Sequence, residues 1–169
     1  MKILLIDDSQ EDRDLILTYI KKIHIKNDVI ETKESKNLKE AFDILTKKTY
    51  DIIILDLKLP GSEGVETINK VNNFLKKINT PIPIIIVTGL EDYKTGRLAF
   101  DIGVKDFLIK DEMKSKELKR SLVFATYYNG NGYTNGNNYP PTFKSFMNPS
   151  FSSFLCPLAR IFLRLSSSQ

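Results

Sequence analysis

Short, continuously apolar runs rich in Ile, Leu and Val constrain the fold of this chain more than any other feature of its sequence. Such runs are typical of strands in a parallel sheet that is covered on both faces. In an open α/β sheet, ligands bind beyond the carboxyl ends of the strands, so polar residues that follow the runs should meet at one edge. These residues are Asp7 and Asp8 after the run 3–6, Asp56 after 52–55, Thr88 after 84–87 and Lys110 after 107–109.

The apolar runs alternate with segments whose apolar residues recur at helical spacing. We predict strands near residues 3–6, 28–32, 52–55, 82–87 and 105–109. The predicted helices lie around 15–23, 38–45, 68–78, 98–102 and 118–125, and Gly103 suits a left-handed residue that ends the fourth. Five βα units in succession imply helices on both faces and right-handed crossovers. The sequence therefore predicts an α/β fold, a flavodoxin-like doubly wound sheet of five parallel strands in the order 2-1-3-4-5 with five helices.

The composition changes after residue 127. The segment that follows is rich in Asn, Gly and Pro and has no periodic apolar pattern up to residue 141. We predict one domain over 1–127 and a disordered tail over 128–169, in which residues 157–165 have the spacing of a short helix. Three interpretations of the tail stay open: a disordered appendage, an out-of-frame or truncated replacement of an output domain, or a segment that docks on a partner or membrane surface.

Charge and cysteine content exclude several classes of protein. The tail holds Lys144, Arg160, Arg164 and no acid, so it supplies three of the four net positive charges and the domain has no basic patch for nucleic acid. The single Cys156 forms no internal disulfide and suits a reducing cytosol, and His24 has no neighbouring metal ligand. No run approaches the roughly 18 apolar residues of a membrane span. We expect a soluble, cytoplasmic protein.

The acidic residues predict a metal site. If Asp7, Asp8 and Asp56 converge, each pair of carboxylates about 4 Å apart repels by roughly 4 kcal/mol at an effective dielectric constant near 20. Lys110 offsets part of this repulsion, and Mg²⁺, which prefers carboxylates, waters and phosphate oxygens, would offset the rest. A carboxylate can also act as a nucleophile that forms an aspartyl-phosphate. Asp56 is the natural acceptor because an accessible loop over 57–64 follows it.

Taken together, these motifs resemble the receiver domain of two-component response regulators, over residues 1 to about 127. Each motif alone is weak, but their order and spacing are highly specific. The matching pieces are the acidic pair Asp7-Asp8, the loop from Asp56 to Gly64 with Leu59-Pro60 inside it, Thr88-Gly89 and the segment 103–110. The resemblance implies that a sensor histidine kinase or a phosphotransfer protein donates the phosphoryl group to Asp56. It also implies that Asp8, Asp56 and the carbonyl of Lys58 bind Mg²⁺, with Asp7 acting through a metal-bound water.

The same resemblance implies a switch. Lys110 would pair with one phosphoryl oxygen and Thr88 would move to hydrogen-bond another, while Phe107 would turn inward to fill the vacated space. These movements would change the surface of the fourth helix, fifth strand and fifth helix, to which a downstream protein would bind. The protein would catalyse only its own phosphorylation and slow dephosphorylation, with no external substrate.

Three positions near the site carry expectations of their own. Asp111 stands where receivers commonly have proline after a cis peptide bond, and a cis bond to a non-proline residue costs about 2.5–4 kcal/mol. We therefore expect a trans bond or local strain between Lys110 and Asp111. Leu90 and Lys58, each two residues beyond a site residue, are predicted to slow the attack of water on the aspartyl-phosphate, a hypothesis that the phosphoryl half-life of Leu90→Asn would test.

Two alternatives to the phosphorelay function remain. An adaptor that binds partners without phosphorylation would still signal after Asp56→Asn. A remnant of a longer DNA-binding response regulator that has lost its output domain would be revealed by in-frame sequence downstream. Flavin binding is disfavoured because Asp7-Asp8 would repel a phosphate at the end of the first strand unless a metal ion intervened.

Overall fold

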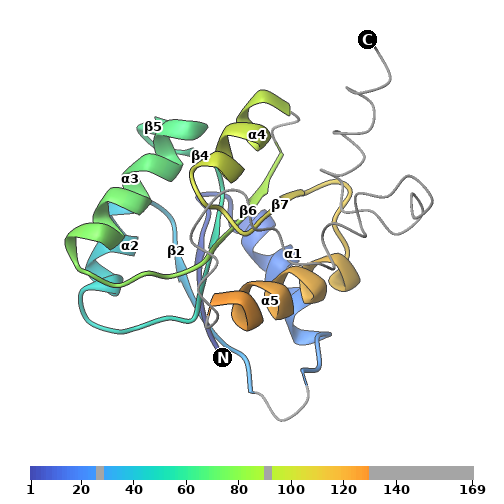
Figure 1. Ribbon diagram of the computed structural model, residues 1–169. Helices are drawn as coiled ribbons and strands as arrows, with labels where there is room; N and C mark the ends of the chain where they lie inside the picture. The colour runs from blue at the N-terminus through green and yellow to red at the C-terminus, as the bar shows by residue number, and fades with distance from the viewer. Residues whose placement is uncertain (26–28, 90–92, 130–169) are drawn as a thin grey trace.

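A five-stranded parallel sheet forms the centre of the computed structural model, which describes residues 1–25, 29–89 and 93–129 (Figure 1). The strands lie in the order β2-β1-β3-β6-β7, which confirms the predicted order 2-1-3-4-5. All neighbouring strands are parallel. Their bounds are β1 Lys2–Ile6, β2 Glu31–Ser35, β3 Ile52–Leu55, β6 Ile84–Thr88 and β7 Asp106–Ile109.

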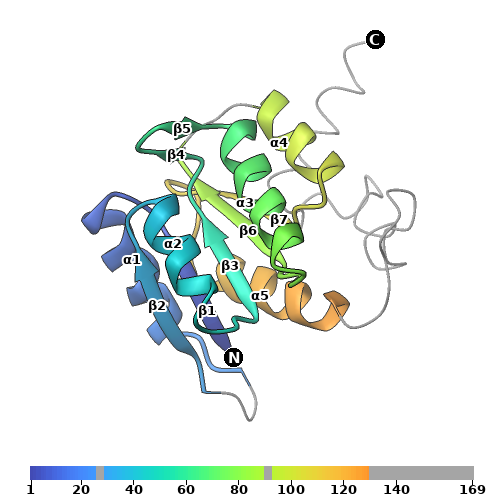
Figure 2. The ribbon, with the colours of Figure 1, turned by 90° about the vertical axis from the view of Figure 1, so that its left-hand side faces the viewer.

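In the described part of the chain, five helices cover both faces of the sheet, with α1 and α5 on one face and α2, α3 and α4 on the other (Figures 1 and 2). The helices are α1 Gln10–Lys21, α2 Leu38–Leu45, α3 Val65–Lys77, α4 Tyr93–Asp101 and α5 Ser115–Asn129. The flavodoxin-like fold predicted from the alternating pattern is therefore confirmed.

The sheet divides the core into two apolar clusters. Along β1, Ile3 and Leu5 pack with α1 and α5, while Leu4 and Ile6 pack with α2 and α3. All four side chains are fully buried. Burial on both faces explains why the central strands read as continuous apolar runs, and each such side chain contributes roughly 1.5–3 kcal/mol of stabilisation.

The structure corrects the position of the second strand. We predicted it near 28–32, but β2 begins at Glu31 and pairs with β1 so that Lys2 lies opposite Glu31 and Ile6 opposite Ser35. Its first three residues are exposed, and β2 lies at one edge of the sheet. The prediction followed apolar residues, and this strand has none.

The loop after Asp56 contains a small antiparallel hairpin that the sequence did not predict. Strand β4, Lys58–Leu59, pairs with β5, Ser62–Glu63. Gly61 occupies the turn at φ 73°, and Gly64 precedes α3 at φ 60°. The hydroxyl of Thr67 then donates a 3.0 Å hydrogen bond to the Leu57 carbonyl, which fastens the start of α3 beneath the loop. This loop is thus an ordered element next to the acidic edge.

Capping residues define the ends of the helices nearest the site. The Ser9 hydroxyl accepts a hydrogen bond from the Asp12 amide at 3.3 Å, so α1 begins directly after the acidic pair. Gly103 has φ 100° after α4, as predicted for a left-handed residue at that position. Both caps fix where the chain enters or leaves the sheet.

Helix α5 runs to Asn129, two residues past the predicted end of the domain at 127. The predictions for the tail, including the short helix over 157–165, fall on residues 130–169 and lie outside the described residues, as does Leu90. Within the described part of the chain, no helix has both the length and the apolar character needed to cross a bilayer.

Candidate functional site

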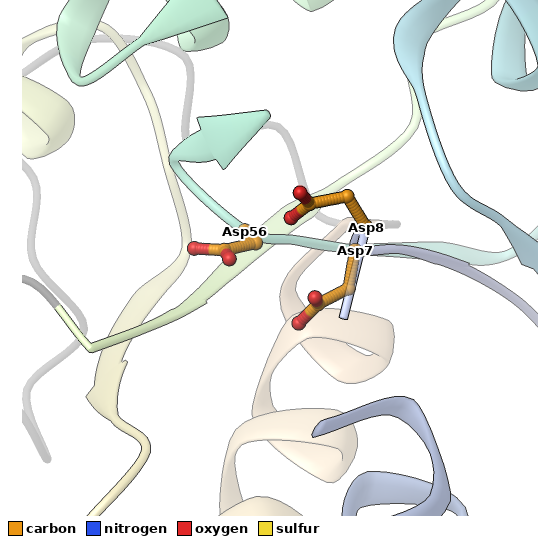
Figure 3. A group of neighbouring side chains, drawn as sticks. All are labelled: Asp7, Asp8 and Asp56. Atoms are coloured by element: carbon orange, nitrogen blue, oxygen red, sulfur yellow. The ribbon is translucent and has the colours of Figure 1, made fainter. Parts of the chain in front are cut away.

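Three carboxylates meet at the carboxyl edge of the sheet, as predicted. Asp7 and Asp8 follow β1, and Asp56 follows β3, its neighbour. One carboxylate oxygen from each lies within 4.8 Å of those of the other two. Figure 3 shows that the three side chains extend toward the same side of this edge. Asp7 and Asp56 are buried, whereas Asp8 is exposed to solvent.

Backbone contacts between strands place these acids. The Asp7 amide donates to the Ser35 carbonyl at 3.0 Å, and the Asp56 amide donates to the Ile6 carbonyl at 2.8 Å. Both residues therefore extend the parallel ladder by one step beyond the ends of their strands. The amide of Ser9 then donates to Asp7 Oδ1 at 2.9 Å. The acidic edge follows from strand register rather than from a mobile loop.

Lys110 is the cation at the centre of the acids. Its Nζ lies 2.7 Å from Asp7 Oδ2, 2.7 Å from Asp12 Oδ2 and 2.9 Å from Asp56 Oδ2. The Lys110 side chain is only 11% exposed. Its backbone amide donates to the Thr88 carbonyl at 3.0 Å, which ties the lysine to the end of β6. The predicted meeting of Asp7, Asp56 and Lys110 is thus present in the structure.

Asp12 is the member of this cluster that the sequence analysis missed. It lies in the first turn of α1, 98 residues away from Lys110 along the chain. Acidic residues are common in the first turn of helices because they complement the positive end of the helix dipole. The one available signal was its position four residues after Asp8, close to the predicted acidic edge.

Arg13 is a buried cation that binds the backbone of the acidic edge. It is 8% exposed and donates a hydrogen bond from Nη1 to the Asp7 carbonyl at 2.7 Å. Its Nε pairs with Glu34 Oε2 at 3.0 Å, and its Nη2 donates to the Gln10 side chain. A buried arginine therefore joins β1, β2 and α1 below the site. The sequence analysis did not single out this residue either.

Burial and neighbouring charges shift the pKa values of two of these groups. Burial raises the pKa of the Asp7 carboxyl above its ordinary value, and the nearby Lys110 ammonium only partly opposes this shift. Burial alone would lower the pKa of Lys110. The carboxylates of Asp12, Asp7 and Asp56 outweigh that effect, so the pKa of Lys110 is raised well above its usual range. Lys110 is fully charged at neutral pH.

The donor set fits a hard divalent cation. Asp7 Oδ2 is buried, and no donor in the described residues approaches it with hydrogen-bond geometry, although the Lys110 ammonium is close. Asp8 and Asp56 add carboxylate oxygens within reach of the same point. Hard cations such as Mg²⁺ take oxygen ligands, and they retain several waters, for which the exposed Asp8 leaves room. The predicted metal ligands from these three residues are brought together.

The remaining predicted residues lie around this cluster. Thr88 is buried at the end of β6, and Phe107 is buried in β7 in the cluster shared with α2, α3 and α4. The predicted inward movement of Phe107 stays a prediction. Lys58 is exposed, and its amide donates to Asp56 Oδ1 at 3.3 Å. Its predicted role as a carbonyl ligand of the metal, and the predicted movement of Thr88, stay predictions.

The bond between Lys110 and Asp111 is trans, because none of the described peptide bonds is cis. The departure from the proline that receivers commonly carry at position 111 is thus accommodated in the way we expected. The lysine still reaches the acids, so a cis bond is not needed to place its side chain.

Residues 3–122 match the family model described as "Response regulator receiver domain". The chain belongs to this family. As a receiver domain of a two-component response regulator, it has the acidic edge and the lysine where the resemblance in sequence implied them.

Curated relatives of this receiver include two proteins of Bacillus subtilis. The transcriptional regulatory protein ResD is 29% identical over 136 residues, which cover 77% of this chain and 52% of ResD. The sensory transduction protein LytT is 29% identical over 132 residues, which cover 73% of this chain and 51% of LytT. The chain therefore spans about half the length of these relatives.

Solved structures of receiver domains have the same fold. A receiver domain protein from Clostridium thermocellum superposes with a TM-score of 0.63 at 25% identity, over 76% of this chain and 96% of that one. The BeF3-activated N-terminal receiver domain of Klebsiella pneumoniae RstA superposes with a TM-score of 0.60 at 21% identity, over 74% and 98% of the two chains. At 21% identity, the similarity to the RstA domain is evidence for a shared fold only.

Proposed function

We propose that this receiver takes a phosphoryl group from a phosphohistidine onto Asp56 and signals through a changed protein surface. The observation that supports Asp56 most directly is its place at the end of the central strand β3. There Asp56 Oδ2 lies 2.9 Å from Lys110 Nζ, and one of its carboxylate oxygens lies within 4.8 Å of an oxygen of Asp7 and of Asp8. Phosphoryl transfer depends mainly on positioning and charge neutralisation, and this arrangement supplies both.

In the transfer step, one carboxylate oxygen of Asp56 attacks the phosphorus in line with the bond to the donor. An oxygen–phosphorus bond forms while the phosphorus–nitrogen bond of the phosphohistidine breaks. The electron pair of that bond goes to the imidazole nitrogen, which takes up a proton. In the later loss of the group, water attacks the phosphorus, the Asp56 carboxylate leaves and inorganic phosphate forms.

The chain's own residues have separate roles in this scheme. Lys110 stabilises negative charge on the phosphoryl oxygens. The hydrogen bond from its backbone amide to the Thr88 carbonyl keeps it at the end of β6. Asp7, Asp8 and Asp56 would hold Mg²⁺, with the Lys58 carbonyl as a further ligand. The metal ion, when bound, supplies positive charge that offsets the acids and the incoming phosphoryl group.

The proposed output surface is formed by α4, β7 and α5. Leu98 on α4 is 48% exposed and Val123 on α5 is 42% exposed, while β7 between these helices carries Phe107 on its buried side. A movement of Phe107 or Thr88 would therefore change the shape of a surface on which apolar side chains are already exposed. We propose that a downstream protein binds this face, and that a histidine kinase or phosphotransfer protein approaches the acidic edge.

Incubation with Mg²⁺ and a small phosphodonor such as acetyl phosphate, followed by intact mass measurement, tests the proposal. The wild type should gain the mass of one phosphoryl group, and Asp56→Asn should gain none. Asp51→Asn is the matched control, because Asp51 is an exposed aspartate at the opposite end of the same strand. Phosphorylation of Asp56→Asn to the wild-type extent would refute the assignment of the acceptor.

A further inference from the structure

Asp12 has a contact that the proposed chemistry does not use. Its Oδ2 accepts a hydrogen bond from Lys110 Nζ at 2.7 Å, which is shorter than the 2.9 Å bond from the same nitrogen to Asp56. Lys110 is the cation paired with Asp12 among the described residues. A carboxylate that no proposed role requires therefore holds the lysine that the phosphoryl group needs.

Three carboxylates share the positive charge of the Lys110 ammonium. Its Nζ donates hydrogen bonds to Asp12 and Asp56, and Asp7 Oδ2 lies 2.7 Å away without hydrogen-bond geometry. A phosphoryl oxygen on Asp56 would therefore compete with these carboxylates for the same ammonium, which carries only three N–H donors. The carboxylate that leaves the lysine at the lowest cost is the one that the phosphoryl group displaces.

The surroundings of the three carboxylates distinguish them. Asp7 and Asp56 are buried, and each accepts a backbone hydrogen bond, from Ser9 and Lys58 respectively. These bonds fix both side chains. Asp12 has a side chain that is 36% exposed, so water can solvate its carboxylate after it leaves the lysine. Displacing Asp12 therefore costs less free energy than displacing either buried acid.

We infer that Asp12 is a positioning residue that competes with the phosphoryl group for Lys110 and so lowers the affinity of the site for that group. This inference rests on the proposed function. In the resting protein, Asp12 holds the Lys110 ammonium toward the first turn of α1. When a phosphoryl group is present on Asp56, the lysine turns to it and Asp12 is released to solvent. The ion pair between Asp12 in α1 and Lys110, the residue after β7, is lost in the same step.

Beryllofluoride, a stable mimic of an aspartyl-phosphoryl group, provides a binding test that does not depend on turnover. We expect Asp12→Asn, with Mg²⁺ present, to reach half saturation at a beryllofluoride concentration about 1.5-fold to fivefold lower than the wild type, the range expected for a partly exposed ion pair. Asp12→Glu keeps the charge and should retain the wild-type value. Glu11→Gln is the control for loss of a negative charge, because Glu11 is an exposed acid in the same helical turn.

The outcomes separate this inference from the proposed function. Equal half-saturation in all four proteins, or the same gain in Glu11→Gln or Asp12→Glu as in Asp12→Asn, would overturn the competition. A wild type that binds beryllofluoride and is phosphorylated on Asp56 would leave the proposed function standing in that case. A wild type that binds none and gains no mass would instead defeat the proposed function itself. Urea unfolding of each variant verifies that all four proteins are folded.

Discussion

Arg13 donates a hydrogen bond to the backbone carbonyl of Asp7 over 2.7 Å, so a buried guanidinium supports the residue that begins the acidic edge. The same side chain pairs with Glu34 on β2, an edge strand of the sheet. Because the Asp7 carbonyl lies just beyond the end of β1, the bond occupies a backbone acceptor that the sheet itself leaves open. The positively charged Arg13 side chain thus lies next to the backbone of the acidic edge.

Replacing Arg13 by Ala should destabilise the protein by about 2 kcal/mol, because the change leaves a buried carbonyl and removes a packed aliphatic stem. Urea unfolding at neutral pH measures the loss. Lys21→Ala on the same helix serves as the control, since Lys21 is exposed and should change stability by no more than about 0.5 kcal/mol. Equal effects of the two changes would show that the Arg13 network does not stabilise the fold.

Asp7→Asn should stabilise the protein in a chelator such as EDTA, and more strongly at pH 7 than at pH 4. Burial raises the folded pKa of Asp7, so ionisation of its carboxyl opposes folding. This cost is absent below the unfolded pKa, near 3.8, and grows as the pH rises toward the folded pKa. The difference in unfolding free energy between variant and wild type, from urea melts at the two pH values, measures it. A difference that does not change with pH would contradict the shift.

Removing Mg²⁺ should lower the stability of the wild type, because an ion that binds only the folded state stabilises it by mass action. The gain rises by about 1.4 kcal/mol for each tenfold excess of ion over its dissociation constant. Asp8→Asn and Asp56→Asn should each reduce this gain, and Asp51→Asn, at the far end of β3, should leave it unchanged. Thermal or urea unfolding with Mg²⁺ and with EDTA gives the comparison. An equal response in all four proteins would argue against the metal assignment.

Gly103→Ala should destabilise the fold by about 1 kcal/mol or more through backbone strain. Gly103 has φ 100°, and a methyl group at its Cα would meet no atom within 4 Å, so strain rather than crowding is the cause. Gly89→Ala, in equally open space and without a positive φ, is the control for the loss of glycine. Similar losses from both changes, measured by urea unfolding, would indicate that the left-handed conformation costs little at position 103.

The central strands and the acidic edge could be predicted from the sequence for one physical reason. Residues in β1, β3 and β6 are buried on both faces, so their apolar runs are unbroken, and the polar residue that ends each run marks the strand's carboxyl end. That pattern places Asp7, Asp56 and Thr88 at one edge of the sheet, and the apolar run 107–109 of β7 brings Lys110 to the same edge. It needs no knowledge of how the helices pack.

The rest depended on contacts that local patterns do not record. Strand β2 is an edge strand of polar residues, stabilised by its ladder with β1 rather than by burial, so an apolar search placed it three residues too early. The contact of Asp12 with Lys110 depends on how the first turn of α1 lies over the sheet. The hairpin of β4 and β5 depends on glycines at positive φ, whose backbone conformation the sequence only permits.

The separation of the core by the sheet has a consequence for how variants of this protein combine. Side chains such as Ile16 and Leu122 belong to one cluster, and Ile68 and Val71 belong to the other, with the backbone of the strands between them. Substitutions on opposite sides share no side-chain neighbours, so their effects on stability should add, whereas two on the same side should interact. Either layer of helices can accordingly be redesigned while the other is left as it stands.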